Sequence, residues 1–407
     1  MNRKHSRLAA AVAGCLALAV AGGTAVCRLG SSGAAPGLKA NLPPLSSQAA
    51  VAHYRLDGGQ ARQAATSPAQ KKPLRNDGTP GRAGKDFLRL AKRYDLSLVP
   101  TYDGSNQETH PKLLYFPTGW NGYRYWMSVT PYPGTDARFE NPCIVTSNDL
   151  KKWVVPKGLK NPVTGVPADV KYGGHYSDSQ LVMNGDVMEL WYRADIGSKK
   201  TRMTDYRSDY YYRITSADGV HWSKPQMMQS SKNSILSLAV VRRQNRYQFW
   251  YTDRSHRLMY GDSADGTHWA DSHQCEIPLP KGYVPWHQDV VFCNDRYYLL
   301  QTALYSPKYS FALFLSESSD GVHFTRGTPF YPSDDPVILH KTWLYRSTFV
   351  PAGNGTFQMV VSYRLPGNKW YMTQCSISQE AWDEACRTNR VVIPGRRASG
   401  GSGTQKL

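Results

Sequence analysis

Five apolar segments of the sequence begin with polar or charged side chains that could carry out chemistry. The segments are THPKLLYF (109–116), HYSDSQLV (175–182), SILSLAVV (234–241), PWHQDVVF (285–292) and WLYRSTFV (343–350). The candidate side chains near their heads are His110, Asp178, His287, Asp289 and Arg346. If the segments lie side by side in the fold, these groups converge on one pocket.

Asp178 and Asp289 form the best pair of carboxylates in this set. Hydrolysis of a glycosidic bond needs two carboxyl groups, one protonated to assist the leaving group and one ionised to activate water or to attack. His287 could act as a general acid or base near neutral pH, or as the ligand of a channel ion. We therefore predict catalytic roles for Asp178, Asp289, His110 and His287, with Arg346 binding an anionic group or a hydroxyl of the substrate.

A repeated heptad indicates how the five segments are arranged. It reads SNDLKKW from 147, SADGVHW from 216, SADGTHW from 263 and SSDGVHF from 318. Each copy follows a strand-like run, supplies a turn through its Asp (149, 218, 265 or 320), and ends in an aromatic residue that can pack back on a sheet. A spacing of roughly 50 residues or more, with several strands per unit, is typical of β-propellers. A fifth, degenerate unit fits between Leu344 and Ser376, so we predict an all-β, five-bladed propeller of four-stranded antiparallel blades.

The chain divides into four predicted segments. Residues 1–27 read as a signal peptide or membrane anchor, 28–85 as a disordered linker, 86–392 as the propeller and 393–407 as a flexible tail. In the first segment, Leu8–Val26 is an uncharged apolar run after a basic start, and Val12–Cys15 leaves a lipoprotein site open. All three interpretations predict an extracellular or envelope-associated protein. Within the propeller segment, helices are expected only around 86–94 and 378–386.

The strand GYRYWMSVTPYP leading into NPCIVTSNDLKKW resembles the blades of the five-bladed propellers in the glycoside hydrolase superfamily of families 32, 43 and 68. The resemblance covers roughly residues 95–376. More narrowly, HPKLLYFPTGWNGYRYWMSVTPYP with FENP resembles exported bacterial proteins related to family 43.

The resemblance also implies an incomplete catalytic set. Inverting family 43 members have Asp in the first blade, Asp in the second and Glu in the third, acting as base, pKa modulator and acid. Only Asp178 matches, because the chain has His110 in the first blade and Ser and Leu in the third. The missing acid would come from Asp289, Glu140 in FENP, or Glu108.

Aromatic residues at loops and strand heads could stack on a sugar ring. The substrate-binding candidates are Trp120, Trp286, Tyr345, Glu140 and Arg346. Structural alternatives remain for the polar candidates: the aspartates could hydrogen-bond to backbone amides, His110 could be a structural hydrogen-bonder, and Arg346 could stack on Tyr345. Residues 192–213 form a basic, tyrosine-rich excursion, either a mobile hairpin or a rim for an anionic glycan.

The charge and the cysteine content limit which classes of partner and cofactor are expected. Lys plus Arg number 49 against 31 acidic residues, a formal charge of +18 that attracts polyanions. No nucleic-acid motif accompanies this charge, and the expected export argues against nucleic acid. Local disulfides Cys275–Cys293 and Cys375–Cys386 are plausible, with Cys143 pairing with Cys27, unless all the thiols are reduced. No metal site or cofactor is predicted, and a channel calcium ion is left open.

Three functions follow from these observations. The first is an exported, glycoside hydrolase-like enzyme that acts on an envelope or exopolysaccharide glycan, such as a furanoside, in the central funnel. The second is a non-catalytic propeller that binds such a glycan. The third is a surface scaffold held on anionic cell-wall polymers, with membrane contact only through the N-terminal segment.

Overall fold

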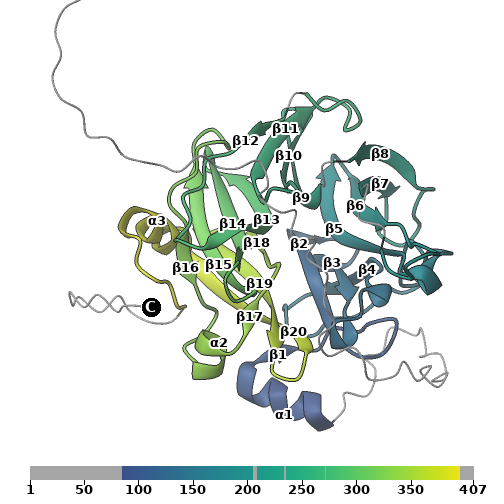
Figure 1. Ribbon diagram of the computed structural model, residues 1–407, viewed down its shortest axis with the longest axis horizontal. Coiled ribbons are helices and arrows are strands. Elements are labelled where there is room, and N and C mark those ends of the chain that lie inside the picture. Colours follow the sequence, from purple (N-terminus) through teal and green to yellow (C-terminus); the bar gives the residue numbers. More distant parts are fainter. Residues whose placement is uncertain (1–84, 205–208, 233–234, 271, 395–407) are drawn as a thin grey trace, which may run out of the picture. The chain divides into compact units, whose positions relative to one another are not determined.

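The computed structural model describes residues 85–204, 209–232, 235–270 and 272–394. The described residues form a five-bladed β-propeller, which confirms the predicted fold class (Figure 1). The predicted signal or anchor segment, the linker up to residue 84 and the tail from residue 395 lie outside the described residues, so the division into four segments stays a prediction. No helix in the described ranges is long and apolar enough to cross a membrane.

Blades I to IV follow one another along the chain. Blade I contains β2 (Glu108–Trp120), β3 (Tyr123–Pro131) and β4 (Cys143–Ser147); blade II contains β5 (His175–Asn184), β6 (Val187–Asp195), β7 (Asp209–Ser216) and β8 (Gln226–Ser231). Blade III contains β9 (Leu236–Arg243), β10 (Arg246–Thr252), β11 (Leu258–Ser263) and β12 (His273–Gln274); blade IV contains β13 (Tyr283–Cys293), β14 (Arg296–Tyr305), β15 (Ser310–Ser318) and β16 (Thr328–Phe330). Neighbouring strands within each blade are antiparallel.

Blade V is completed by the N-terminal strand. It contains β17 (Trp343–Leu344), β18 (Thr348–Pro351), β19 (Thr356–Leu365) and β20 (Lys369–Ser378), and β1 (Leu96–Ser97) pairs with β20 through Leu96 and Thr373. The innermost strands contact one another in a closed ring, β2 to β5 to β9 to β13 to β18 and back to β2 (Figure 1). The five apolar segments of the sequence are therefore the funnel strands, as predicted.

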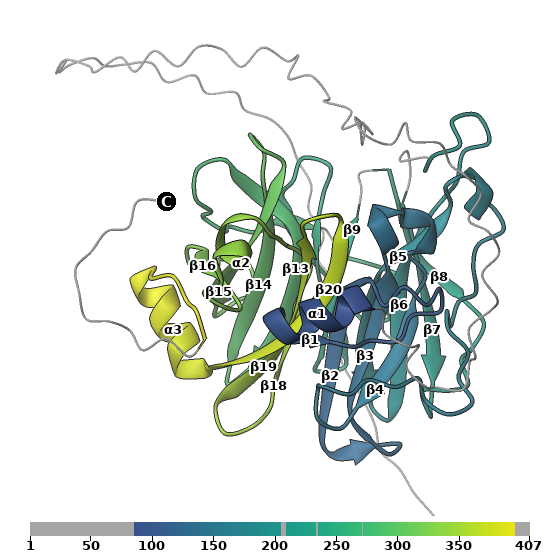
Figure 2. The same cartoon turned by 90° about the horizontal axis from the view of Figure 1, so that it is seen from below.

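The two expected helices are present, and a short third one precedes blade V. α1 (Lys85–Tyr94) leads into β1 and lies beside it and β20 (Figure 2). α2 spans Pro336–His340. α3 (Gln379–Thr388) is capped by Ser378, whose side chain accepts a hydrogen bond from the Ala381 N–H. Short 3-10 helices cover Pro133–Thr135, Ala137–Phe139 and Val170–Tyr172.

The repeated heptads are turns, as predicted. In the second copy, Asp218 Oδ1 accepts hydrogen bonds from the backbone N–H groups of Val220 and His221, both at 2.8 Å. Gly219 has φ +75° and packs directly on Trp126 of blade I, since a Cβ atom at Gly219 would lie 2.2 Å from the indole ring. Gly266 and Gly321 pack on the tryptophans of blades II and III in the same manner. These three heptads therefore join their own blades to the preceding ones.

The two local disulfides that the sequence left open, Cys275–Cys293 and Cys375–Cys386, are not formed, and these four cysteines are free thiols. Cys275 packs beside Trp250, in the cluster between blades III and IV, whereas Cys293 packs against the cluster between blades IV and V. Cys375 on β20 and Cys386 in α3 both lie against the latter cluster as unpaired thiols. Cys27, the expected partner of Cys143, lies outside the described residues.

Candidate functional site

Irregular strand pairing turns the funnel side chains toward the centre. The ladder of β2 is interrupted between Thr109 and Lys112, and that of β5 between Ser177 and Gln180. His110, Asp178 and Ser237 lie at such breaks with φ values of 52°, 51° and 57°. Left-handed backbone at non-glycine residues costs about 1–3 kcal/mol and clusters at functional sites. The strained backbone therefore indicates a functional site at the heads of β2, β5 and β9.

Asp178 is the centre of this site, and its side chain is 1% exposed. Its Oδ2 atom lies 3.0 Å from Arg193 Nε and accepts a hydrogen bond from the Ser237 N–H, also at 3.0 Å. Arg346 Nη1 donates to Oδ1 at 3.5 Å. Burial alone would raise the pKa of Asp178, but Arg193, then the two histidines and Arg346, hold it well below its usual value. Asp178 is therefore a carboxylate at neutral pH.

Two histidines face the Oδ1 atom of Asp178. His110 Nε2 and His287 Nδ1 each lie 3.8 Å from it, and one donor atom from each of the three residues lies within 4.8 Å of the others. Among the described residues, neither His110 Nε2 nor either nitrogen of His287 has a hydrogen-bond partner. Burial lowers the pKa of His287 well below its usual value, although Asp178 opposes this shift. Neutral imidazoles and a carboxylate are ligands that divalent transition metals prefer.

The charges around this cluster also favour a cation. Four carboxylates and two guanidinium groups meet there, which leaves a formal charge of −2 when the imidazoles are neutral. They belong to Asp178, Asp195, Asp209, Glu140, Arg193 and Arg346. Since all six are largely buried, water screens this charge only weakly. The cluster of His110, Asp178 and His287 thus fits one divalent cation.

Glu140 orients one of the two imidazoles. Its Oε2 atom lies 3.2 Å from His110 Nδ1, and Thr130 Oγ1 lies 3.0 Å from the same nitrogen. A carboxylate that accepts the N–H of one ring nitrogen leaves the other nitrogen free to bind a metal. Glu140, a substrate-binding candidate by sequence, therefore supports His110.

Asp289 does not belong to the cluster. Its Oδ1 atom lies 2.6 Å from Lys112 Nζ, and its Oδ2 atom accepts hydrogen bonds from Thr348 Oγ1 at 2.7 Å and from the Phe349 N–H at 3.3 Å. Asp289 is therefore an ion-paired carboxylate held by a buried lysine, and its expected catalytic pairing with Asp178 stays a prediction. His287, two residues earlier on β13, does reach Asp178.

The remaining predicted residues divide between the site and elsewhere. The Tyr345 ring lies against both histidines, with centroids 4.6 Å from His287 and 5.5 Å from His110. Trp286 Nε1 donates to the Tyr345 hydroxyl at 3.4 Å, so these two aromatic residues lie beside the cluster as expected. Trp120 lies at the opposite end of β2 from the cluster and stacks on Phe116. It is therefore too far along the strand to make the contact with a substrate at the cluster that the sequence predicts.

Arg346, expected to meet a substrate, contacts groups of the protein instead. It is 1% exposed, and its Nη2 atom donates to Gln180 Oε1 at 3.1 Å and to the Leu238 carbonyl at 3.3 Å. Together with its contact to Asp178, these bonds use most of its donors. The anion that Arg346 meets is thus Asp178.

Sequence reasoning missed Arg193 and Ser237. Arg193 lies on β6 and bridges three carboxylates, contacting Asp195 and Asp209 at 3.3 Å in addition to Asp178. The sequence signal was an arginine inside an apolar strand, VMELWYRAD, where an unpaired charge would be costly. Glu108, the other acid considered from the sequence, is fully buried, and burial raises the pKa of its carboxyl well above the usual value.

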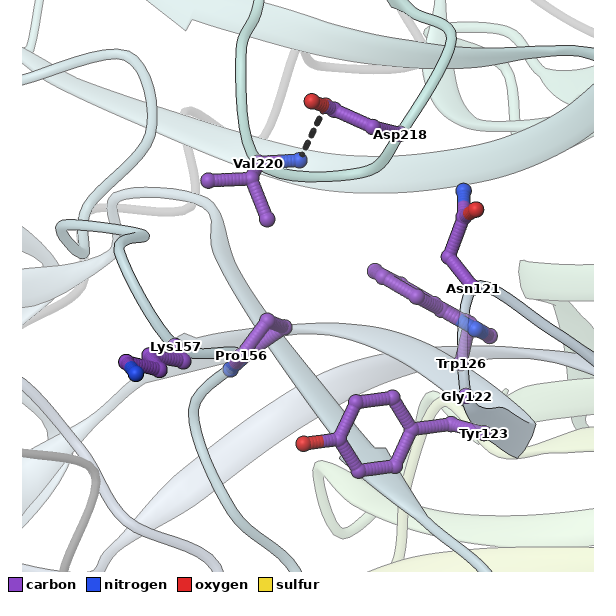
Figure 3. A pocket seen from close by; sticks show the side chains of 8 residues that line it. All are labelled: Asn121, Gly122, Tyr123, Trp126, Pro156, Lys157, Asp218 and Val220. Atoms are coloured by element: carbon purple, nitrogen blue, oxygen red, sulfur yellow. Dashed lines mark hydrogen bonds between the residues drawn. The ribbon is translucent and has the colours of Figure 1, made fainter.

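A separate pocket of about 540 Å³ lies between blades I and II (Figure 3). Its lining includes Asn121 and Tyr123 from the β2–β3 hairpin, Lys157, and Asp218 from the heptad turn. These turns stand at the ends of the strands opposite to the heads that carry His110 and Asp178. The pocket contains none of the cluster residues and is not the candidate site.

The fold and site together define a class: a five-bladed β-propeller with a buried His-Asp-His cluster at the heads of its inner strands. No family model matches the sequence. The structure is similar to that of an N-acetylgalactosamine deacetylase from F. plautii in complex with blood group B trisaccharide, with a TM-score of 0.58 and 20% identity over 76% of this chain and 97% of that one. It is also similar to a mutant of the GH43 protein BlXynB from Bacillus licheniformis, with a TM-score of 0.50 and 12% identity over 68% of this chain and 54% of that one.

Part of the sequence has a characterised relative. Over 123 residues, 30% of this chain, it is 37% identical to the A type blood N-acetyl-alpha-D-galactosamine deacetylase of Flavonifractor plautii. The matched part spans 15% of the length of that protein. These similarities confirm the five-bladed fold that the sequence indicated, which glycan-acting proteins of the GH43 type share.

Proposed function

We propose that this protein is a metal-dependent deacetylase of an N-acetylated glycan, with His110, Asp178 and His287 holding a divalent cation. The observation that carries the proposal is the cluster itself: two imidazoles with free nitrogens and one carboxylate, in surroundings with a formal charge of −2. Such a cation would polarise an amide carbonyl and lower the pKa of a bound water.

The chain's own residues have distinct roles in this proposal. Arg193 and the Ser237 N–H hold Oδ2 of Asp178, which leaves Oδ1 facing the imidazoles. Glu140 holds the proton on His110 Nδ1, so that Nε2 keeps its lone pair for the cation. The Tyr345 hydroxyl accepts from Trp286 Nε1 and can donate its own hydrogen to a substrate oxygen beside the cluster.

Two further observations support amide rather than glycoside hydrolysis. A glycosidase needs two carboxyl groups about 5–9.5 Å apart that flank the bond, and Asp289 is committed to Lys112. The proteins with deacetylase in their names match this chain in fold and, over a limited stretch, in sequence. Export, and a glycan of the bacterial envelope or an exopolysaccharide as the substrate, remain part of the proposal and rest on the N-terminal sequence.

The test is to measure acetate and reducing sugar in the same reaction. The full chain is stripped with EDTA, reloaded with Mn²⁺, Zn²⁺ or Mg²⁺, and incubated with N-acetylgalactosamine- and N-acetylglucosamine-containing oligosaccharides. We expect acetate release that needs the metal and is lost in Asp178→Asn and His287→Ala. The matched control is His323→Ala, an exposed histidine in a heptad turn, which should keep wild-type activity. Metal-independent acetate release, or release that survives His287→Ala, would contradict the proposal.

A glycosidase is the second candidate, because Asp178 and Glu140 contact opposite nitrogens of the same His110 ring. Reducing sugar released without acetate, and abolished by Glu140→Gln, would favour it. If neither product forms but the oligosaccharide binds and Asp178→Asn weakens that binding, the protein is a non-catalytic glycan-binding propeller. Salt-sensitive binding to wall polymers that ignores Asp178→Asn would favour a surface scaffold.

A further inference from the structure

The described part of the segment that follows β6 lies at the end of blade II that carries Asp178. We call residues 196–204 the blade II rim. Its position follows from strand pairing, since His175 at the head of β5 pairs with Asp195, the residue before the rim. The rim, which is the described part of the basic excursion expected from the sequence, therefore stands at the same end of blade II as Asp178.

Glycines fix the blade II rim against the segment that leads into β5. A Cβ atom at Gly173 would lie 2.8 Å from the Met203 backbone, and one at Gly197 would lie 2.6 Å from the Gly174 nitrogen. The Gly197 N–H donates to Asp169 Oδ2 at 2.6 Å, and the Thr204 hydroxyl donates to the Gly173 carbonyl at 3.1 Å. This close packing holds the rim in one place, unlike a free hairpin.

The blade II rim, residues 196–204, contains three basic side chains and no acidic one. Lys199, Lys200 and Arg202 are exposed, and none of them forms an ion pair with another described residue. Lys171, also exposed, lies on the neighbouring segment with its amine 5.1 Å from the centre of the Tyr172 ring. The acids of the described neighbouring segments are already bound: Asp169 accepts from Gly197, while Asp195 and Asp209 contact Arg193.

The rim also offers apolar surface next to these charges. Ile196 is 44% exposed and Met203 is 46% exposed. A sugar ring with an attached anion could place its apolar face on these side chains and its charge on the lysines and the arginine. One divalent cation would balance the formal charge of −2 at the cluster, so the exposed lysines and the arginine of the rim are the groups that attract an anion.

We propose that the blade II rim binds the anionic groups of an acidic glycan, a carboxylate- or phosphate-bearing polymer, whose acetamido group enters the funnel. This inference rests on the proposed function, because the funnel would then receive the acetamido group. It names the substrate class: acidic N-acetylated glycans bind more tightly than neutral ones of the same length.

The experiment compares two affinities by calorimetry on the metal-loaded full chain. The acidic probe is a hyaluronan oligosaccharide and the neutral probe is a chitooligosaccharide of equal length; a wall teichoic acid bearing N-acetylglucosamine separates phosphate from carboxylate. The rim variant is Lys199→Ala, Lys200→Ala and Arg202→Ala together. The control variant removes three exposed lysines at the opposite strand ends, through Lys151→Ala, Lys152→Ala and Lys224→Ala.

We expect the wild type to prefer an acidic probe, with an affinity that falls as salt rises. The rim variant should lower the acidic-to-neutral affinity ratio about five- to tenfold, since each exposed charge contributes roughly a factor of two, and the control should keep the ratio. A wild-type ratio near one, or an equal loss in the control variant, would overturn the rim proposal. Absence of acetate release from every probe would sink the proposed function but leave this ratio measurable, so the two failures are distinguishable.

Discussion

Replacing Asp289 with asparagine should destabilise the protein by about 3–5 kcal/mol, the usual cost of breaking a buried ion pair from one side. The two side chains of the pair are 2% and 6% exposed, and Asp289 Oδ1 lies 2.6 Å from Lys112 Nζ. An asparagine oxygen can still accept from Thr348 and Phe349, which donate to Asp289 Oδ2. It cannot balance the charge of Lys112, so the lysine would be left buried and uncompensated.

The assay is equilibrium unfolding in urea, followed by tryptophan fluorescence, for the wild type, Asp289→Asn, Lys112→Met and the double variant. The double variant buries no unpaired charge, so its loss of stability should be smaller than the sum of the two single losses. Acetate release by the folded fraction of Asp289→Asn should stay close to that of the wild type. If Asp289→Asn instead unfolds like the wild type within about 0.5 kcal/mol and loses activity, Asp289 is a catalytic residue and our interpretation of the Lys112 pair is refuted.

Three other perturbations test the site and the heptads. Arg193→Lys should weaken Mn²⁺ binding about 10- to 100-fold in calorimetry, because a lysine cannot bridge three carboxylates; unchanged affinity would exclude a positioning role. Gly219→Ala should cost about 1–3 kcal/mol or more in urea unfolding, since the new methyl meets a tryptophan 2.2 Å away, whereas Gly355→Ala, with φ +67° and open space, should cost less. Asp320 accepts several hydrogen bonds, and the one from the backbone N–H of His323 has the largest effect. These bonds lower the pKa of Asp320 below the pKa of an aspartate in the unfolded chain. The ionised group therefore stabilises the fold above about pH 4, so the stability gap between wild type and Asp320→Asn should close as the pH falls below 4, and a gap independent of pH would contradict this.

The fold was predictable because its local signals agree with one another. The heptads locate the turn after the third strand of four blades, and the polar heads of apolar runs locate the innermost strands. β1 escaped prediction because it has only two residues, Leu96 and Ser97, and is too short for any periodicity. Its pairing with β20 is a tertiary contact, which no local sequence pattern can predict.

The types of the site residues were predictable from the sequence, but the position of each side chain along the axis of the funnel was not. Alternation puts His287 and Asp289 on the same face of one strand, yet two residues separate them by about 6–7 Å along the strand. That step takes Asp289 from the cluster to Lys112, a neighbour from another blade. The irregular strand pairing could not be predicted from the sequence either. The left-handed backbone at Ser237 in the third blade brings its N–H to Asp178, and a serine in the sequence does not indicate such a contact.

The pairing of β1 with β20 has a consequence for how the chain folds. Leu96 emerges early during synthesis, but its partner Thr373 is made only when the last blade is nearly finished. Contacts between such distant residues carry a large loop-closure entropy and slow the folding of a domain. We expect ring closure to be a late event, so that blades I to IV exist for a time as an open array. The unpaired strand edges of that array are exposed, and at this stage the nascent protein is most prone to aggregate.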